Sequence, residues 1–344
     1  MDEECRPPLI WLFLSVPDVQ GRLGLQTRGP ARGNAHAAIA AGKGQLHCAW
    51  LASEKLQCGG SMPLRRGLLP VLLLPFLFFV AVSAAQNVQG ACTEIVLSPY
   101  SAFTYGINNA GDVVGYYQNE SDGYDGYLRT ADGNETIIDY PGFAGATQAY
   151  GINDKGQVVG TAGAQVFLYD IASQTFSDVD LQGLSNAGLV AINNAGAIVG
   201  TTTVNDTSYG YIAKSGHVTL LLPPGAASAS AYGVSRNGTV IGSATLKNGS
   251  NIYYSYLKGK YSRIRNVPGL TAISPSASYF VGNKVNKYGE YVGFMRHGKS
   301  GFNFECGETV GLGVNDSGQA VGYYGFIGDP FVDGFIWSPT VPGR

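Results

Sequence analysis

The stretch Tyr105-Gly-Ile-Asn-Asn-Ala-Gly-Asp-Val-Val-Gly-Tyr-Tyr117 occurs, with changes, six times in this chain of 344 residues. Each copy consists of two short apolar runs that flank a polar tetrad ending in glycine. Asn or Asp early in such a tetrad and Gly at its end are typical of a type I turn followed by a left-handed residue, so each copy predicts a β-hairpin. The six copies begin at Tyr105, Tyr150, Val190, Tyr232, Asn283 and Leu312.

The spacing of the copies indicates the architecture. The glycines that follow the second apolar run are Gly115, Gly160, Gly200, Gly242, Gly293 and Gly322, and they are separated by 45, 40, 42, 51 and 29 residues. A period near 42 residues fits the blades of a β-propeller, which have about 40–45 residues each. The residues that open the predicted turns are Asn108, Asn153, Asn193, Ser235, Asn286 and Asn315.

Further strands complete the units. A third run follows each hairpin, as in residues 125–130, and a fourth follows in most units, as in residues 135–140. The last unit stops after its third strand at Trp337, while an unpartnered strand at residues 93–97 precedes the first unit. A closed ring would use that strand to complete the last blade. We therefore predict an all-β, six-bladed propeller.

Two details of packing follow from the same pattern. The spacing of 29 residues before the last repeat leaves no room for a fourth strand after Phe302, so the fifth blade is expected to have three strands. Within a strand, Tyr105 and Ile107 face one side and Gly106 faces the other. Large residues of one unit could therefore pack against glycines of its neighbour.

The repeat resembles the HAF family of probable extracellular repeat proteins, which are mostly bacterial. The resemblance rests on the recurring pattern Gly-Ile-Asn-x-x-Gly-x-Val-Val-Gly and covers essentially all of residues 92–339. The fourth and fifth copies depart most from it, at Ser235-Arg-Asn and Asn283-Lys-Val. The resemblance implies secretion and a repeat architecture, but it supplies no reaction and no catalytic residues.

The N-terminal part has a different character. Arg65 and Arg66 precede an apolar run at residues 67–82 and the small-residue exit Ser83-Ala-Ala85, which is typical of a signal peptide over 62–85. An uncleaved membrane anchor at 67–85 is the alternative, because 19 residues just reach the length of about 17–25 that spans a bilayer. Residues 1–61 form an irregular leader, interpreted as mistranslated upstream sequence or as a short cytoplasmic tail. The propeller would then comprise residues 86–344.

Charge and composition exclude some classes of protein. The formal net charge is −2 for the whole chain and −5 for residues 86–344, which contain all 21 tyrosines. A nucleic-acid-binding protein would show a basic stripe, so we expect no nucleic-acid partner. Only 13% of the residues are charged, which argues against a helical bundle.

Two cysteines remain after the leader. Cys92 and Cys306 form an even pair in a chain expected to be exported, which suggests a disulfide. In the ring, Cys92 opens the outer strand of the last blade and Cys306 ends the third strand of the blade beside it. Closing a loop of 214 residues would stabilise the fold by about 4–5 kcal/mol. A Cα–Cα separation above about 7 Å would rule the bond out.

The Asn/Asp turns could be taken for calcium loops. Calcium requires several oxygen ligands, usually multiple carboxylates, whereas each turn provides at most one or two. Asn and Asp are also the usual residues of such hairpin turns. We therefore predict no metal site and no cofactor.

The sequence argues against catalysis. Residues 86–344 contain two histidines, His217 and His297, and no Gly-x-Ser-x-Gly motif, so a Ser-His-Asp triad is not indicated. No residue is assigned a catalytic role.

We expect a secreted, monomeric, non-catalytic binding or scaffolding propeller whose partner is an extracellular glycan or protein. The alternative is a secreted polysaccharide hydrolase or lyase. Three or more charged or aromatic side chains at one channel mouth would favour the enzyme. A lining of Gly, Ile, Val and Asn alone would favour the scaffold.

Overall fold

The computed structural model describes residues 90–97, 101–120, 123–186, 188, 190–325 and 332–340. These residues belong to one compact unit of the chain, residues 79–344. The predicted leader (1–61), the predicted signal segment (62–85) and residues 86–89 lie outside the described part. Every regular element in that part is a β-strand, and the strands form six four-stranded antiparallel sheets.

The first three sheets follow one another along the chain, each built from four consecutive strands. From the innermost to the outermost strand they are β2 (Ala102–Ile107), β3 (Val113–Gln118), β4 (Tyr124–Arg129) and β5 (Glu135–Ile138); β6 (Thr147–Ile152), β7 (Gln157–Ala162), β8 (Gln165–Asp170) and β9 (Thr175–Asp178); and β10 (Ala191–Ile192), β11 (Ile198–Val204), β12 (Thr207–Lys214) and β13 (His217–Leu221).

The next two sheets have the same order, and the last borrows its outer strand from the start of the described chain. They are β14 (Ala226–Val234), β15 (Val240–Leu246), β16 (Asn251–Leu257) and β17 (Lys260–Ile264); β18 (Ala272–Ile273), β19 (Tyr279–Val285), β20 (Tyr291–His297) and β21 (Ser300–Phe304); and β22 (Glu308–Val314), β23 (Ala320–Gly325), β24 (Asp333–Pro339) and β1 (Gly90–Ile95).

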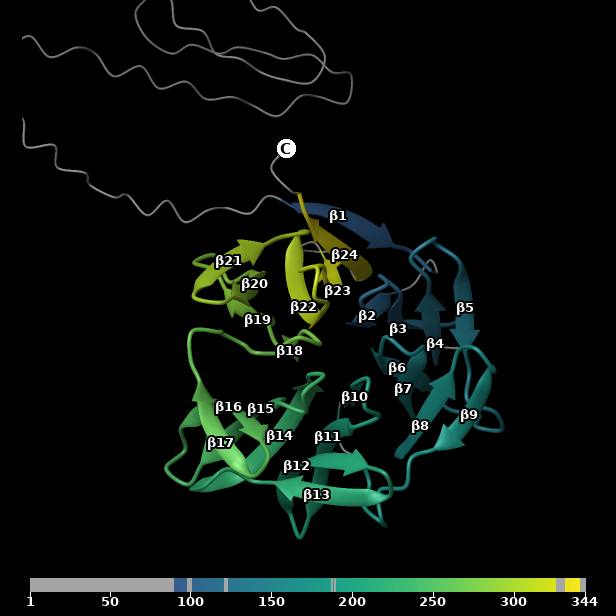
Figure 1. Cartoon of the computed structure of the whole chain (residues 1–344). Coiled ribbons are helices and arrows are strands. Elements are labelled where there is room, and N and C mark those ends of the chain that lie inside the picture. Colours follow the sequence, from purple (N-terminus) through teal and green to yellow (C-terminus); the bar gives the residue numbers. More distant parts are fainter. Residues whose placement is uncertain are drawn as a thin grey trace, which may run out of the picture. The chain divides into compact units, whose positions relative to one another are not determined.

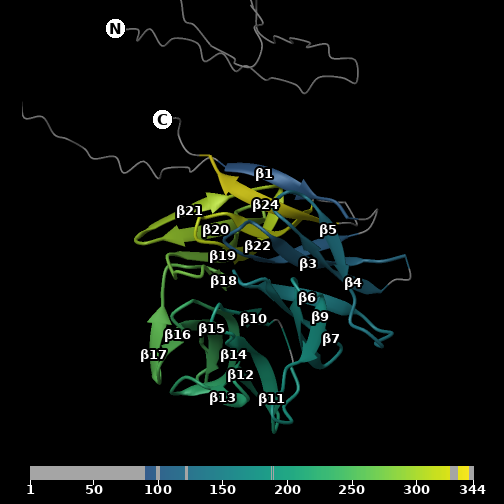
Figure 2. The same cartoon turned by 45° about the vertical axis from the view of Figure 1, so that its right-hand side comes forward.

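The sheets are the blades of a six-bladed β-propeller. They are arranged around one axis, with β2, β6, β10, β14, β18 and β22 nearest to it (Figure 1). The predicted fold is therefore confirmed. The predicted closure is confirmed as well, because β1 pairs with β24 in the last blade, with Cys92 opposite Trp337 (Figure 2). This pairing joins the two ends of the repeat array into a ring.

The prediction for the fifth blade was wrong. This blade has four strands, and its innermost hairpin is β18–β19 rather than the segment that begins at Asn283. Gly282, not Gly293, occupies the position of Gly242 and Gly322, and it lies 40 residues from each of them. The sequence also suggests a third strand at residues 301–305, but most of this segment belongs to the outermost strand, β21, which ends at Phe304.

Asn286 therefore does not belong with the other turn residues. It opens the hairpin between β19 and β20, which lies at the opposite end of β19 from the β18–β19 turn. The turn that matches the other five begins at Ser274. The prediction failed because the β19–β20 turn has the same local chemistry as the five genuine ones. Asn286 Oδ1 accepts from the backbone N–H groups of Tyr288 and Glu290.

The hydrophobic core is divided into layers, most of which lie between two neighbouring blades. Between the first and second blades, for example, Val114 and Leu128 pack with Ala149 and Phe167. Burial of these faces holds each blade to its neighbours, because a single blade cannot cover its own apolar surface.

The glycine considered in the sequence, Gly106, does meet the neighbouring unit, because a Cβ there would lie 2.9 Å from the carbonyl oxygen of Tyr150. A second recurrent glycine, on the second strand of each blade, is paired instead with an aromatic residue on the third strand of the same blade. The opposed pairs are Gly115–Tyr127, Gly160–Phe167, Gly200–Tyr211, Gly242–Tyr254, Gly282–Phe294 and Gly322–Phe335.

Cys92 and Cys306 are joined by a disulfide, with their Cα atoms 5.8 Å apart. The bond connects β1 with the segment that follows β21. Cys306 had been predicted to end a third strand. It follows the fourth strand of its blade instead. The disulfide links the outer edges of the fifth and sixth blades, and its Cys92 lies in β1, the strand that closes the ring.

Candidate functional site: the axial cavity

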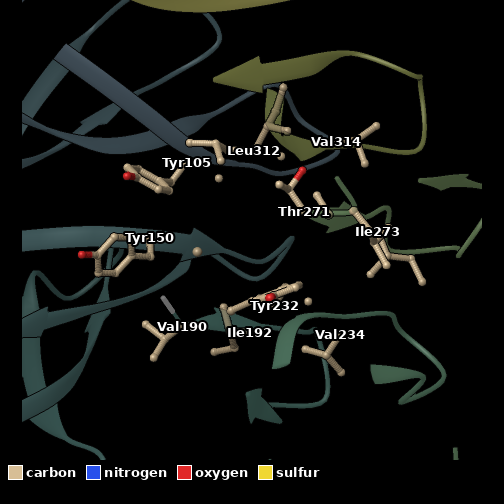
Figure 3. Close-up of a pocket in the computed structure, with 18 of the residues that line it drawn as sticks. Tyr105, Tyr150, Val190, Ile192, Tyr232, Val234, Thr271, Ile273, Leu312 and Val314 are labelled. Carbon is tan, nitrogen blue, oxygen red and sulfur yellow. The ribbon is translucent and has the colours of Figure 1, made fainter. Parts of the chain in front are cut away.

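The innermost strands of all six blades line one cavity of about 490 Å³ on the propeller axis (Figure 3). Each blade contributes a larger residue, then Gly or Ala, then a β-branched residue, and in β10 and β18 the first of the three lies just before the strand. Because the innermost strand of every blade runs in the same direction along the axis, equivalent residues lie at the same level. The triads are 105–107, 150–152, 190–192, 232–234, 271–273 and 312–314.

A β-bulge marks the first position of four triads. The pairing of β2 with β3 skips Tyr105, and the equivalent residues Tyr150, Tyr232 and Leu312 are skipped in the same way. A bulge bends its strand and re-aims the neighbouring side chain. It therefore sets the direction of these four side chains at one mouth of the cavity, which is called here the tyrosine mouth.

The second position keeps the inner strands close together. A Cβ on Gly106 would lie 2.9 Å from the carbonyl oxygen of Tyr150, and one on Gly313 would lie 2.6 Å from that of Tyr105. Such distances are too short for a side chain. The small residues thus allow neighbouring blades to meet at the axis, which keeps the cavity narrow.

The tyrosine mouth continues into a cluster of aromatic rings over the sixth, first and second blades. Successive rings have centroids 5.0–6.0 Å apart, within the range of favourable aromatic pairs. The hydroxyls of Tyr105 and Tyr116 are 3.1 Å apart. This cluster, called here the tyrosine crescent, consists of Phe103, Tyr105, Tyr116, Tyr124, Tyr150 and Tyr323.

Tyr105 and Tyr150 remain neutral phenols in ordinary buffers. Burial raises the pKa of Tyr105, and the neighbouring Tyr116 raises it further. Burial also raises the pKa of Tyr150. Because an unperturbed tyrosine already titrates near pH ~10, these two hydroxyls are poor proton acceptors near neutral pH.

Further polar groups reach the cavity from the fourth and fifth blades. Tyr232 and Ser243 share a hydrogen bond between their hydroxyls. Thr271 Oγ1 donates to the carbonyl oxygen of Gly311 at 2.8 Å. Tyr253 and Asn251 complete the polar part of the wall. No Asp, Glu, Lys, Arg or His belongs to the described residues that line the cavity.

The other end of the cavity is built from the turns between the first and second strands of the blades. Asn108, Asn153, Asn193 and Asn315 are at most 5% exposed, as are Ser235 and Ser274. The asparagine oxygens accept backbone N–H groups of their own turns, as Asn315 Oδ1 does from Ser317 and Gln319. These turn residues are therefore buried structural groups.

Hydrogen bonds join the six turns into a closed circle, called here the turn ring. Each turn bonds to the next with a donor–acceptor distance of 2.7–3.1 Å. The bonds are Asn109 N to Asp154 Oδ1, Asp154 N to Asn194 Oδ1, Asn193 Nδ2 to Ser235 O, Arg236 N to Pro275 O, Ser276 N to Asp316 Oδ1 and Asn315 Nδ2 to Asn108 O.

Charged side chains meet across the turn ring. Arg236, from the fourth blade, lies 3.6 Å from Asp154 of the second and 3.3 Å from Asp316 of the sixth. Asn109 Nδ2 donates to the same two carboxylates. Contacts between the second, fourth and sixth blades require these side chains to extend across the axis of the ring.

The remaining sequence candidates lie away from this site. His217 is exposed on the outermost strand of the third blade, and His297 stacks on Tyr279 with 4.3 Å between ring centroids. In the described residues no group of three or more His, Cys, Asp or Glu could hold a metal ion. No described segment forms a helix of the length and apolar character needed to cross a bilayer.

Sequence reasoning missed the fifth blade's contribution, Thr271-Ala-Ile273, because Ser274-Pro-Ser replaces the usual Asn-containing turn. The sequence did contain a pattern that identifies the second strand of this blade. Tyr279-Phe-Val-Gly282 follows this turn and restores an even spacing of 40 residues to both neighbouring glycines. The sequence also gave no indication that Tyr253 and Asn251, from third strands, would reach the cavity.

Comparison with known proteins gives only distant likenesses. No family model matches the chain, and no curated protein matches it. The structure is similar to TolB from Acinetobacter baumannii at 11% identity, over 67% of each chain and with a TM-score of 0.49. It is similar to an inactive virginiamycin B lyase from Staphylococcus aureus, crystallised with quinupristin, at 12% identity, over 72% of this chain and 99% of that one, with a TM-score of 0.46. A putative gluconolactonase matches at 9% identity, over 74% and 94% of the two chains, with a TM-score of 0.45.

Proposed function

We propose that this chain is a secreted, non-catalytic binding propeller that holds an uncharged part of an extracellular glycan or protein in its axial cavity. The observation that carries the proposal is the lining of the cavity. All six blades contribute to it, four tyrosines are among its residues, and none of the described lining residues carries a charge at neutral pH. Pockets of about 300–1,000 Å³ with a mainly apolar wall and a few polar groups are typical ligand sites.

The same lining argues for binding rather than bond cleavage. Glycoside hydrolysis generally uses two carboxyl groups that flank the scissile bond. The two carboxylates that meet across the turn ring, those of Asp154 and Asp316, are both bound by Arg236 and Asn109. Their oxygens are thus occupied by structural hydrogen bonds, and they lie beyond the cavity wall.

Export is supported by three features. A disulfide joins Cys92 and Cys306, and such bonds persist in oxidising, extracytoplasmic compartments. The signal-peptide pattern at 62–85 and the resemblance of the repeats to the HAF family point in the same direction. N-terminal sequencing of the exported protein tests this part: a start at Gln86 supports secretion, and retention of 67–85 contradicts it.

A polysaccharide hydrolase or lyase is the second candidate, and one observation favours it. Aromatic side chains do converge at one mouth, with two tyrosine hydroxyls 3.1 Å apart. Time courses of the exported protein with polysaccharides, followed by reducing ends and by absorbance of unsaturated products, test for cleavage. Turnover that is lost in Tyr105→Phe would establish the enzyme.

The binding proposal is tested by a glycan-array and peptide-array screen of the exported protein. Hits are repeated with Tyr232→Ala, which alters the cavity wall, and with Tyr288→Ala as a matched control. Tyr288 is 73% exposed on the β19–β20 hairpin and does not line the cavity. Loss of binding in Tyr232→Ala alone supports a cavity ligand. Equal loss in both variants contradicts it.

A further inference from the structure

The inner part of the axial cavity is apolar on every side. The third residue of each triad forms a belt that we call the β-branched belt. Its members retain 4–8% exposure, whereas core valines such as Val113 retain none. All of them line the cavity, so this residual exposure faces its interior. The belt consists of Ile107, Ile152, Ile192, Val234, Ile273 and Val314.

The polar groups lie on either side of this belt and differ in kind. At the tyrosine mouth they are the hydroxyls of Tyr232 and Thr271 and the rings of Tyr105 and Tyr150, whose hydroxyls point away from the middle of the cavity (Figure 3) and bond to Tyr116 and Gln148. At the far end, Arg236 is placed against Asp154 and Asp316 in the turn ring. A ligand that enters from the mouth therefore meets aromatic rings and hydroxyls first, the apolar belt next, and the polar side chains of the turn ring last.

We propose that the cavity binds a neutral amphiphile, with an alkyl or aryl group inserted into the β-branched belt and an uncharged, hydroxyl-bearing head at the tyrosine mouth. This inference rests on the proposed binding function and specifies the chemistry of the ligand. A bare sugar in the belt would leave its hydroxyls without partners, which is costly in an apolar site. A carboxylate or ammonium group would find no opposite charge among the described lining residues.

The head group is matched to the mouth by the same reasoning. Tyrosine rings offer apolar faces, and their hydroxyls both donate and accept hydrogen bonds. The tyrosine crescent extends this surface from Tyr105 outward to Tyr116 and Tyr124. A polyol or sugar head can therefore contact rings and hydroxyls together while its apolar tail occupies the belt.

The test uses n-alkyl β-glucosides from methyl to heptyl, titrated below their micelle concentration into the exported protein by calorimetry. Each methylene buried in the belt should increase the affinity about three- to fourfold until the chain reaches the turn ring. Equal affinity for the methyl and heptyl compounds overturns the inference. Equal affinity for the heptyl glucoside and for heptyl sulfate, which has the same tail but a charged head, also overturns it.

A variant tests whether the alkyl tail lies in the belt. Val234→Phe adds bulk inside the cavity and should weaken heptyl glucoside at least tenfold. Ile137→Phe is the control, because Ile137 is 61% exposed on the outer strand β5. Equal binding by the two variants contradicts the assignment. If Val234→Phe does not fold, saturation transfer from protein methyl groups to the alkyl protons, measured on the unaltered chain, provides the answer instead; its absence contradicts the assignment.

The outcomes separate this inference from the proposed function. If glycan or peptide hits depend on Tyr232 but no alkyl chain-length effect exists, the binding function stands and the amphiphile inference falls. If alkyl glucosides bind with the expected chain-length dependence but are consumed, the amphiphile inference stands and the non-catalytic function falls.

Discussion

At the scale of single residues, one glycine in each of the four bulged blades permits the geometry of the mouth. A Cβ on Gly322 would lie 1.9 Å from the carbonyl oxygen of Val310, and Gly115 and Gly242 meet equivalent oxygens at 1.9 Å. In each case the contacted carbonyl belongs to the residue two positions before the bulged residue on the partner strand. The bulge brings this carbonyl close to the partner strand, and only glycine leaves room for it. The glycine thus supports the bulge that directs Tyr105 or Tyr232.

Gly322→Ala should therefore lower the free energy of unfolding by about 3 kcal/mol, the upper end of the usual cost of overpacking. Gly216→Ala serves as the control. It has a positive φ of 74° but nothing within 4 Å of the added carbon, so only backbone strain of about 1–2 kcal/mol is expected. Urea unfolding of both variants measures the difference. A smaller loss for Gly322→Ala than for Gly216→Ala would contradict the steric explanation.

Asn315 performs several structural tasks at once. Its side chain accepts two N–H groups of its own turn and donates to the carbonyl oxygen of Asn108 in the next blade. Asn315→Ala leaves these buried groups without partners, so the free energy of unfolding should fall by about 2–4 kcal/mol.

The matched control is Asn248→Ala. Asn248 accepts a similar backbone bond from Ser250 but is exposed, so water can replace it. Its loss should stay within about 1 kcal/mol. Thermal unfolding of both variants under the same conditions makes the comparison, and equal destabilisation would argue against the role assigned to burial in the turn ring.

At the scale of elements, the ring depends on the strand that completes the last blade. β1 covers the free edge of β24, and the Cys92–Cys306 disulfide fixes its start to the fifth blade. An exposed edge strand would otherwise offer unpaired backbone groups to other chains. The bond also spans 214 residues, so it restricts the unfolded chain strongly.

Replacing both cysteines, Cys92→Ser with Cys306→Ser, should lower the free energy of unfolding by about 2–5 kcal/mol. Guanidinium unfolding of the wild type with and without reductant, beside the double variant, measures the effect. The reduced wild type and the double variant should agree. A wild type that is insensitive to reductant under unfolding conditions would contradict the assigned contribution of the disulfide.

At the scale of the whole molecule, the turn ring connects blades that are distant in sequence. Burial by itself raises the pKa of Asp316, but hydrogen bonds from the hydroxyl and backbone amide of Ser276 and from Asn109 outweigh it, so the pKa lies below its ordinary value. A carboxyl group with a lowered pKa in the folded state stabilises the fold fully above its unfolded pKa, near pH ~4. The contribution is lost as the pH falls through the folded pKa.

Asp316→Asn should accordingly destabilise the protein at pH 7, and the difference from wild type should shrink as the pH is lowered below about 4. Asp206→Asn, in the exposed hairpin between β11 and β12, is the control and should change little. Melting temperatures of the three proteins across pH 3–7 test this. A difference between Asp316→Asn and wild type that grows on acidification would have the wrong sign.

The repeat pattern by itself determined the class of fold, the number of blades, the use of the first strand to complete the last blade, and the cysteine pair. These features depend on local turn chemistry and on spacing, which a one-dimensional pattern contains. The error in the fifth blade shows the limit of that information. Asn286 and Asn108 open turns with the same hydrogen bonds, and only strand pairing shows that they lie at opposite ends of their blades.

Only the tertiary structure decided what the axis contains. Tyr232 and Thr271 are 39 residues apart, and Arg236 lies 80 residues from Asp316, so their meeting depends on ring closure and not on any local preference. The bulges that direct the tyrosines, the apolar belt beneath them and the charged side chains of the turn ring follow from the way six inner strands converge. The sequence specifies each inner strand separately, by its local pattern. The cavity exists only where the six inner strands meet in the folded ring.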